Sequence, residues 1–206
     1  IQSKFIRGLR VTDEKIIDIV ESVLIDFNND IVDSLKKFGT EAISIHTKKN
    51  NIIEVSPEAK ELGFVGIPKQ IDNNLLEKIL NQKQVPIISP LGLGNDNHAY
   101  NINGDIAAGA IAKSLKSRRL LLMTNVKGVL DKDKKLINEI SSSEILKMIE
   151  DNIITEGMIP KIKTCLDAVK NGVTAVGIID GRKQHSILFE IFSDKGSGTL
   201  IRKWKI

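Results

Sequence analysis

The chain has 206 residues, of which 41% are hydrophobic and 27% are charged. That content suffices for one α/β domain or two small lobes, and it excludes a disordered chain. Thirty basic residues against 26 acidic ones leave a net charge of +4, and since the basic residues are scattered we expect no nucleic acid as partner. With no long apolar run and one cysteine, Cys165, we expect no membrane span, no disulfide framework and a cytoplasmic location.

Helical and extended patterns alternate along the first half, which is typical of an α/β fold. Thr12 and Asp13 can cap a helix that ends at Gly39. Its apolar residues recur every three or four positions: Ile16, Val20, Val23, Phe27, Ile31, Leu35 and Phe38. Residues 42–46 and 52–55 are expected to form a hairpin-like pair of strands. A short helix after Asp72 and a strand over residues 85–89 follow.

The second half repeats this alternation. The pair Ser141 and Glu144 has capping-box spacing and predicts a helix through residue 149. The other expected elements are helices over 105–116, 159–170 and 184–192, and buried strands over 120–124 and 174–179. We therefore predict a three-layer α/β fold, with a mainly parallel sheet flanked by helices.

A Gly-rich loop follows the strand over residues 85–89, where α/β sheets commonly bind ligands. Asn101 and Asn103 alternate, so in an extended segment both side chains lie on one side. Asp105 can cap the next helix or orient a nearby cation. A surface loop with an ordinary helix cap explains the same residues equally well. The sequence has neither a G-x-G-x-x-G turn before this helix nor a P-loop.

Two further loops carry candidate binding residues. In the loop over 124–131, Gly128 permits the close backbone approach that a nucleotide needs, although a plain β-turn fits as well. Lys161 lies in the first turn of a predicted helix, where it opposes the helix dipole unless an anion binds there; a solvated lysine is the alternative. Arg10 can grip a carboxylate with its guanidinium fork, or form an ordinary surface ion pair. The three histidines show no metal-ligand spacing, so we expect no protein-held metal.

Eight segments resemble the amino-acid kinase superfamily, and within it the acetylglutamate kinases. They stand in the family's order along nearly the whole chain. The segments are 8–13 (GLRVTD), 62–66 (LGFVG), 88–92 (ISPLG), 100–105 (YNINGD), 107–110 (AAGA), 126–131 (VKGVLD), 157–161 (GMIPK) and 178–182 (IIDGR).

The resemblance implies transfer of the γ-phosphoryl group of Mg-ATP to the side-chain carboxylate of N-acetyl-L-glutamate, a step of arginine biosynthesis. Residues 1–117 would form the acetylglutamate-binding and dimerisation lobe, and residues 118–206 the nucleotide lobe. By analogy, Lys161 and Asp105 would be catalytic, and Arg10, Asn101 and Asn103 would bind acetylglutamate. The nucleotide would contact Asn125, Val126, Lys127, Gly128, Val129 and Leu130. The resemblance also implies a homo-oligomer, either a dimer or a hexamer.

The sequence departs from the family pattern in three places. The family's first strand and two Gly-rich turns, one with a catalytic lysine, would precede Gly8 and are not among these residues. Asn125 stands where the family commonly has aspartate, and residues 44–51 lack its usual Ser-Gly-Lys-Asp pattern. We therefore expect a polypeptide of these residues alone not to phosphorylate acetylglutamate at a normal rate. The alternative function is a non-catalytic regulatory relic that binds a nucleotide or an amino acid.

Overall fold

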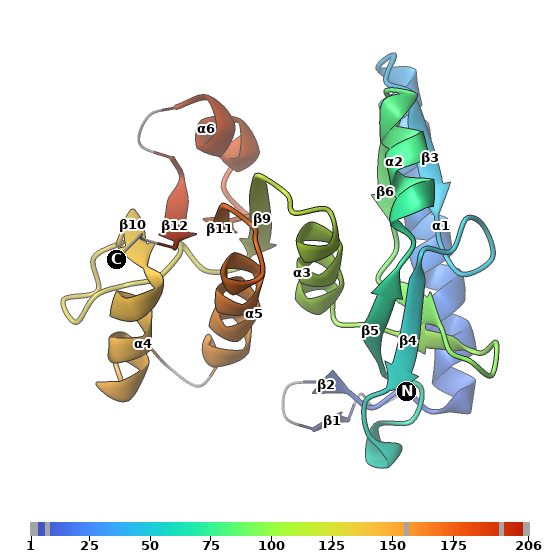
Figure 1. The fold of residues 1–206 in the computed structure, drawn as a ribbon, viewed down its shortest axis with the longest axis horizontal. Helices are drawn as coiled ribbons and strands as arrows, with labels where there is room; N and C mark the ends of the chain where they lie inside the picture. Colours follow the sequence, from blue (N-terminus) through green and yellow to red (C-terminus); the bar gives the residue numbers. More distant parts are fainter. Residues whose placement is uncertain (1–3, 7–8, 155–156, 194–195, 204–206) are drawn as a thin grey trace. The chain divides into compact units, whose positions relative to one another are not determined.

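The computed structural model describes residues 4–6, 9–154, 157–193 and 196–203. They fall into two compact units, Ile1–Ala110 and Ile111–Ile206. Strands and helices alternate through both units (Figure 1). The α/β class expected from the sequence, with sheets flanked by helices, is confirmed. No helix in the described ranges has both the length and the apolar character needed to cross a membrane.

The first unit holds three small sheets and the helices that pack on them. Its elements are β1 (Phe5–Ile6), β2 (Leu9–Arg10), α1 (Glu14–Lys37), β3 (Ala42–Ile45), β4 (Ile53–Pro57), the 3-10 turn η1 (Lys60–Leu62), β5 (Gly66–Ile71), α2 (Asn73–Asn81), β6 (Val85–Ile88), β7 (Leu91–Leu93), β8 (Ala99–Asn101) and the start of α3 (Gly104–Ser114).

Helix α1 begins as predicted, because the Asp13 carboxylate accepts hydrogen bonds from the backbone N–H groups of Lys15 and Ile16. The face that it buries differs from the apolar stripe in the sequence. Its buried residues are Ile17, Glu21, Asn28 and Val32, whereas Val23, Phe27 and Phe38 are 59%, 60% and 88% exposed. The reason is that α1 packs against β3, β6 and β8. The β3–β6 pair and the turns that follow these strands offer polar partners to Asn28 and Glu21.

Asn28 is the centre of a buried polar network between α1 and the β3–β6 pair. Its side-chain amide donates to the Ile87 carbonyl at 2.8 Å and to Ser89 Oγ at 3.1 Å. Its Oδ1 accepts from Ser44 Oγ at 2.6 Å. Since buried polar groups are costly unless hydrogen-bonded, this network determines which face of α1 meets the sheet.

The expected hairpin of residues 42–46 and 52–55 is wrong. β3 pairs in parallel with β6, and β4 lies in another sheet of order β5-β4-β7-β8. Within that sheet β4 is antiparallel to β5 and parallel to β7, and β7 is antiparallel to β8. Within the polar turn after β3, His46 and Lys49 form an isolated bridge. β3 and β4 do not pair with each other, because β3 pairs with β6 and β4 pairs with β5 and β7.

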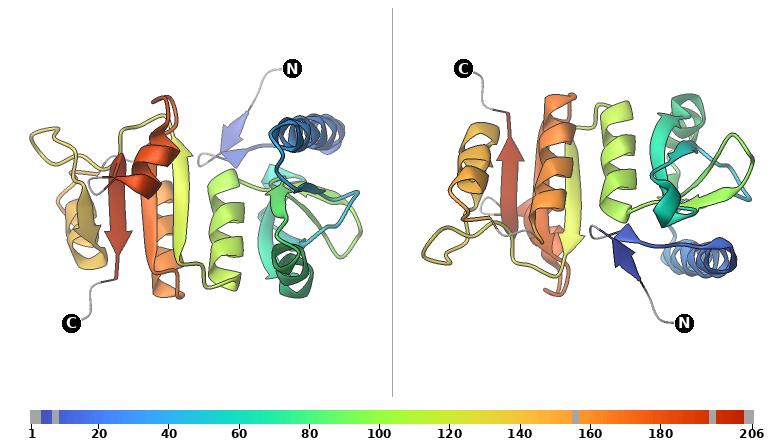
Figure 2. Two further views of the ribbon diagram at one scale, coloured as in Figure 1. Left: turned by 90° about the horizontal axis from the view of Figure 1, so that it is seen from above. Right: turned by 90° about the horizontal axis from the view of Figure 1, so that it is seen from below.

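The second unit is built on one four-stranded sheet of order β10-β12-β11-β9. β9 and β11 run parallel, as do β10 and β12, and β11 is antiparallel to β12. Helices α5 and α6 both pack on β11 and lie on opposite faces of the sheet (Figure 2). After the end of α3 the elements are β9 (Arg119–Thr124), β10 (Glu139–Ser141), α4 (Ser142–Glu150), α5 (Ile159–Lys170), β11 (Ala175–Asp180), α6 (Ser186–Phe192) and β12 (Gly198–Arg202).

Several local signals in this unit act as the sequence predicts, but the expected burial of the strand over 120–124 is wrong, because β9 is at the edge of the sheet and its Met123 is 47% exposed. Ser141 and Glu144 form a capping box at the start of α4. Strand β11 is buried from Ala175 through Ile179, as expected for a central strand covered on both faces. Cys165 is fully buried on α5, in keeping with its role as a small apolar residue. This packed sheet fixes the ends of β9 and β11, where the loops described next begin.

Candidate active site

A cavity of about 790 Å³ opens in the second unit, between the loop after β9 and the start of α5. The six residues that the family resemblance assigns to the nucleotide, residues 125–130, all line it, and so does Lys161. The structure thus brings together two sequence segments about 30 residues apart. Within this unit they form one concave site at the carboxyl end of β9, where α/β sheets place ligands.

The shape of this loop depends on a residue that the sequence analysis missed. Thr199, on β12, is 1% exposed. Its Oγ1 accepts a hydrogen bond from the backbone N–H of Val129 at 2.8 Å and donates to the carbonyl of Ile137 at 2.6 Å. Gly128 has φ of +139°, and a Cβ there would lie 2.6 Å from Thr199 Oγ1. Glycine is therefore required where the loop crosses this threonine.

Positive charge gathers around the cavity. Lys127, Lys134, Lys161 and Arg182 are all in its lining. Arg182 donates from Nε and NH2 to the two carboxylate oxygens of Asp180, each at 2.9 Å. This bidentate pairing lowers the pKa of Asp180 to about 2. No Asp or Glu is among the described residues that line the cavity, which suits the site to an anion. Neither Lys134 nor Arg182 was predicted as a site residue. Lys134 lies outside the family segments, and segment 178–182, which contains Arg182, was given no binding role.

The other part of the cavity wall is apolar. Ile153, Ile154 and Met158 contribute to it, together with Val129 and Leu130. A site with an apolar wall beside several cations can accept a molecule that has a flat apolar end and a charged end. Ile153 and Ile154 were not predicted, because the sequence between α4 and α5 has no regular pattern.

Lys161 lies in the first turn of α5, as predicted. The helix starts at Ile159 and carries Pro160 within its first two positions, where the missing N–H of proline is harmless. Lys161 is half-buried and lines the cavity. Glu156, which precedes this turn in the sequence, lies outside the described residues.

In the first unit, Arg10 and Asn101 are linked through Thr12. The fully buried Thr12 hydroxyl donates to the carbonyl of Arg10 at 3.2 Å and accepts from the Asn101 side-chain amide at 3.3 Å. Thr12 is itself held by backbone hydrogen bonds to Leu62 and Phe64. The two residues predicted to bind the same molecule therefore belong to one connected cluster. Gly8, in the same motif, lies outside the described residues.

Of the two roles considered for Asp105, that of a helix cap is wrong. The Oδ1 of Asn103 accepts from the backbone N–H groups of Asp105 and Ile106, at 3.0 and 3.3 Å, and its carbonyl accepts from Ala107. Asn103 is thus the cap of α3. Asn101 lies on β8 and donates to Thr12. Asn103 instead uses its side chain to cap α3. Asp105 lies in the first turn of α3.

Comparison with known proteins identifies the family. A model of the amino acid kinase family matches residues 1–180. An acetylglutamate kinase from Pelagibacter ubique (strain HTCC1062) is 56% identical over 203 residues, which make up 98% of this chain and 70% of that protein. This chain belongs to the acetylglutamate kinases of the amino acid kinase family.

Solved structures show the same fold. The smu.665 protein from Streptococcus mutans UA159 superposes with a TM-score of 0.83 at 31% identity, over 98% of this chain and 78% of that one. N-acetylglutamate synthase from Neisseria gonorrhoeae, solved with coenzyme A and N-acetyl-glutamate, gives a TM-score of 0.90 over 100% of this chain and 48% of that one. At 23% identity, the second likeness shows the shared fold alone.

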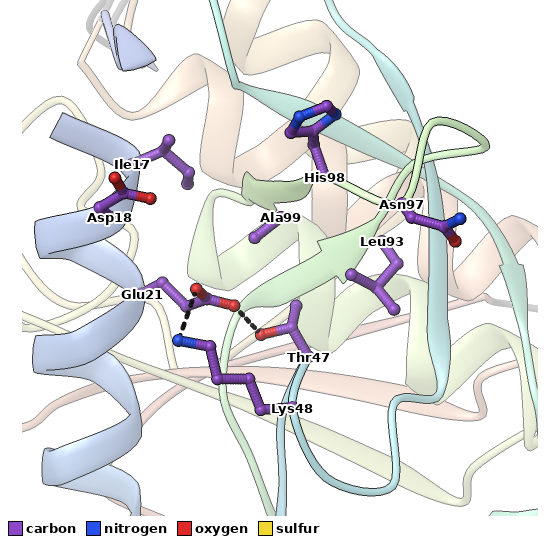
Figure 3. A pocket seen from close by; sticks show the side chains of 9 residues that line it. All are labelled: Ile17, Asp18, Glu21, Thr47, Lys48, Leu93, Asn97, His98 and Ala99. Carbon is purple, nitrogen blue, oxygen red and sulfur yellow. Dashed lines mark hydrogen bonds and ion pairs between the residues drawn. The ribbon is translucent and has the colours of Figure 1, made fainter. Parts of the chain in front are cut away.

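The segment that departs from the acetylglutamate kinase pattern, residues 44–51, lies beside a second hollow of about 370 Å³ in the first unit (Figure 3). Here Glu21 of α1 accepts a hydrogen bond from Thr47 Oγ1 at 2.5 Å and pairs with Lys48 Nζ at 3.1 Å. His46, beside them, has a lowered pKa because burial disfavours its charged form. These contacts anchor α1 to the turn after β3, so this segment has a structural role.

The described residues offer no cluster of three or more His, Cys, Asp or Glu side chains that could hold a metal ion.

Proposed function

We propose that this protein transfers the γ-phosphoryl group of Mg-ATP to the side-chain carboxylate of N-acetyl-L-glutamate, yielding an acyl phosphate and ADP, as a step of arginine biosynthesis. The observation that carries the proposal is the 56% identity to an acetylglutamate kinase over 98% of the chain. The cation-lined cavity of the second unit, which contains the loop 125–130 and Lys161, supports it.

The chemistry needs little from the protein beyond alignment and charge neutralisation. A carboxylate oxygen of the acceptor forms a bond to the γ-phosphorus while the bond to the β–γ bridging oxygen breaks, and ADP leaves. The carboxylate is already ionised, so no general base is required. The ammonium group of Lys161 would neutralise charge on the transferring phosphoryl group. Such preorganised contacts contribute about 2–4 kcal/mol to transition-state stabilisation.

The acceptor would be held by the first unit. Arg10 has a guanidinium fork suited to a carboxylate. Thr12 connects the backbone carbonyl of Arg10 to Asn101, whose amide can bind the acetamido or carboxylate group. Asn103 would lie near the acceptor and would shape its site by capping the start of α3. Asp105, in the first turn of that helix, would orient the lysines around the phosphoryl group.

The function is tested by trapping the acyl phosphate with hydroxylamine. We expect hydroxamate formation to require both ATP and N-acetyl-L-glutamate, and Lys161→Met to lower the rate at least about 30-fold, in line with a loss of about 2 kcal/mol or more. Lys163→Met, two residues along the same helix and exposed, is the matched control and should leave the rate unchanged. A protein that binds ATP yet forms no hydroxamate would instead be the non-catalytic relic.

We also propose that the chain forms a homo-oligomer through α1. Ile19, Val23 and Phe27 are 50%, 59% and 60% exposed, and their spacing of four residues places them on one face of a 24-residue helix. A second copy can bury such a stripe by packing its own α1 against it. Phe27→Asp should convert the oligomer to a monomer in sedimentation equilibrium, whereas Asn29→Asp, at an exposed polar position of the same helix, should not. An unchanged mass for Phe27→Asp would refute this interface.

A further inference from the structure

The Asp180–Arg182 pair at the end of β11 lies outside every residue set assigned above. Asp180 is the last residue of β11 and pairs in register with Thr124, the last residue of β9. The turn that follows is closed by a hydrogen bond from the Gly181 N–H to the Thr124 carbonyl at 2.8 Å. Arg182 is thereby held beside the point where the nucleotide loop leaves β9.

The guanidinium of Arg182 is fixed in orientation by this turn. Nε and NH2 each donate to an oxygen of Asp180 at 2.9 Å, and the backbone N–H of Arg182 donates to Asp180 Oδ1 at 3.0 Å. The Asp180 side chain is only 14% exposed, whereas that of Arg182 is 64% exposed. The carboxylate therefore acts as an anchor and the guanidinium as the presented group.

Arg182 retains donors for a second anion. A guanidinium has five N–H donors, of which two serve Asp180, and the side chain lines the cavity that contains Lys127 and Lys161. Planar, preoriented arginines suit phosphate oxygens better than a flexible lysine does, because less side-chain freedom is lost per hydrogen bond.

We propose that Arg182, oriented by Asp180, is a further binding residue for the phosphate chain of the nucleotide. The proposal rests on the function proposed above and adds a residue to its nucleotide site. It implies that Arg182 contributes to the affinity for nucleoside di- and triphosphates and contributes nothing to the affinity for the nucleoside. The apolar wall formed by Ile153, Ile154 and Met158 is then left to hold the base.

The test is direct binding of ATP, ADP and adenosine, measured by calorimetry on the wild-type protein and on Arg182→Gln. We expect ATP and ADP to bind about tenfold more weakly to the variant, as for loss of one charged hydrogen-bonding contact at a partly exposed site, with adenosine affinity unchanged. Lys183→Gln is the matched control: it removes the same charge one residue away, where the ammonium lies over the Phe189 ring, and it should bind all three ligands like the wild type.

Arg182→Lys separates charge from geometry. It keeps the positive charge but cannot form the fork with Asp180, so we expect it to regain less than half of the lost affinity on a logarithmic scale. Unchanged ATP affinity in Arg182→Gln, an equal loss for adenosine, or full affinity in Arg182→Lys would each overturn the proposal. Failure of the wild-type protein to bind ATP would instead refute the proposed function. Circular dichroism of each variant is the control for a retained fold.

Discussion

Replacing Thr199 by valine removes one hydroxyl group from beneath the loop over residues 124–131, called here the nucleotide loop, while keeping the side-chain shape. The hydroxyl makes two hydrogen bonds, with the Val129 N–H at 2.8 Å and the Ile137 carbonyl at 2.6 Å. A buried backbone group left without its partner costs about 1–3 kcal/mol. Val129 is 1% exposed and cannot recover water, but Ile137 is half-buried and can do so in part. We therefore expect Thr199→Val to lower the free energy of unfolding by about 2–4 kcal/mol.

The assay is urea denaturation followed by circular dichroism, paired with calorimetric titration of ATP. Thr199→Ser keeps the hydroxyl and should lose only about 1 kcal/mol, the contribution of one buried methyl group. Thr174→Val changes an exposed threonine and should stay within about 0.5 kcal/mol of the wild type. ATP affinity should fall for Thr199→Val and stay nearly constant for the other two. A Thr199→Val protein as stable as the wild type would refute the reasoning that this hydroxyl anchors the loop.

Three further perturbations test other parts of the structure. Asn28→Ala should lower the free energy of unfolding by about 2–4 kcal/mol, because it leaves the buried partners of the amide unsatisfied, whereas the exposed Asn29→Ala should cost under about 0.5 kcal/mol in the same urea titration. The folded-state pKa of Asp180 is about 2, below its ordinary 3.8, so its ionised form adds stability that is present above about pH 4 and is lost as the pH falls toward 2. The stability difference between the wild type and Asp180→Asn should therefore shrink over that interval, and a difference that does not depend on pH would contradict this. Gly128→Ala should weaken ATP binding, because the positive φ and the close approach of Thr199 leave no room for a methyl group; equal affinity in calorimetry would show that the loop adapts.

Helix α1 shows how far sequence patterns carry and where they stop. Its start at Asp13 could be predicted, because a capping carboxylate acts on N–H groups two and three residues away. Its buried face could not. The apolar stripe of Val23 and Phe27 is exposed, and the buried face carries Glu21 and Asn28, whose partners lie 16 or more residues later in the chain. Periodicity identifies a helix, but it cannot identify the surface that the helix meets.

The candidate site divides in the same way. Residues 125–130 and Lys161 were found because each lies in a short segment that resembles a known family, and the structure of the second unit lines one cavity with them. Thr199 lies in no such segment, and Arg182 lies in one, residues 178–182, to which no binding role was assigned. Thr199 matters because β12 passes beneath Gly128, and Arg182 because Asp180 orients it at the end of β11.

By itself, the sequence determined the alternation of helices and strands, the caps of α1 and α4, the family, and the loops where a nucleotide would bind. These depend on interactions between residues a few positions apart, or on motifs that are contiguous in the chain. Only the tertiary structure decided that β3 pairs with β6 rather than with β4, that Asn103 caps α3, and that Thr199 supports the nucleotide loop. These are long-range choices, since a strand or a hydroxyl takes whichever partner the rest of the fold brings within hydrogen-bonding distance.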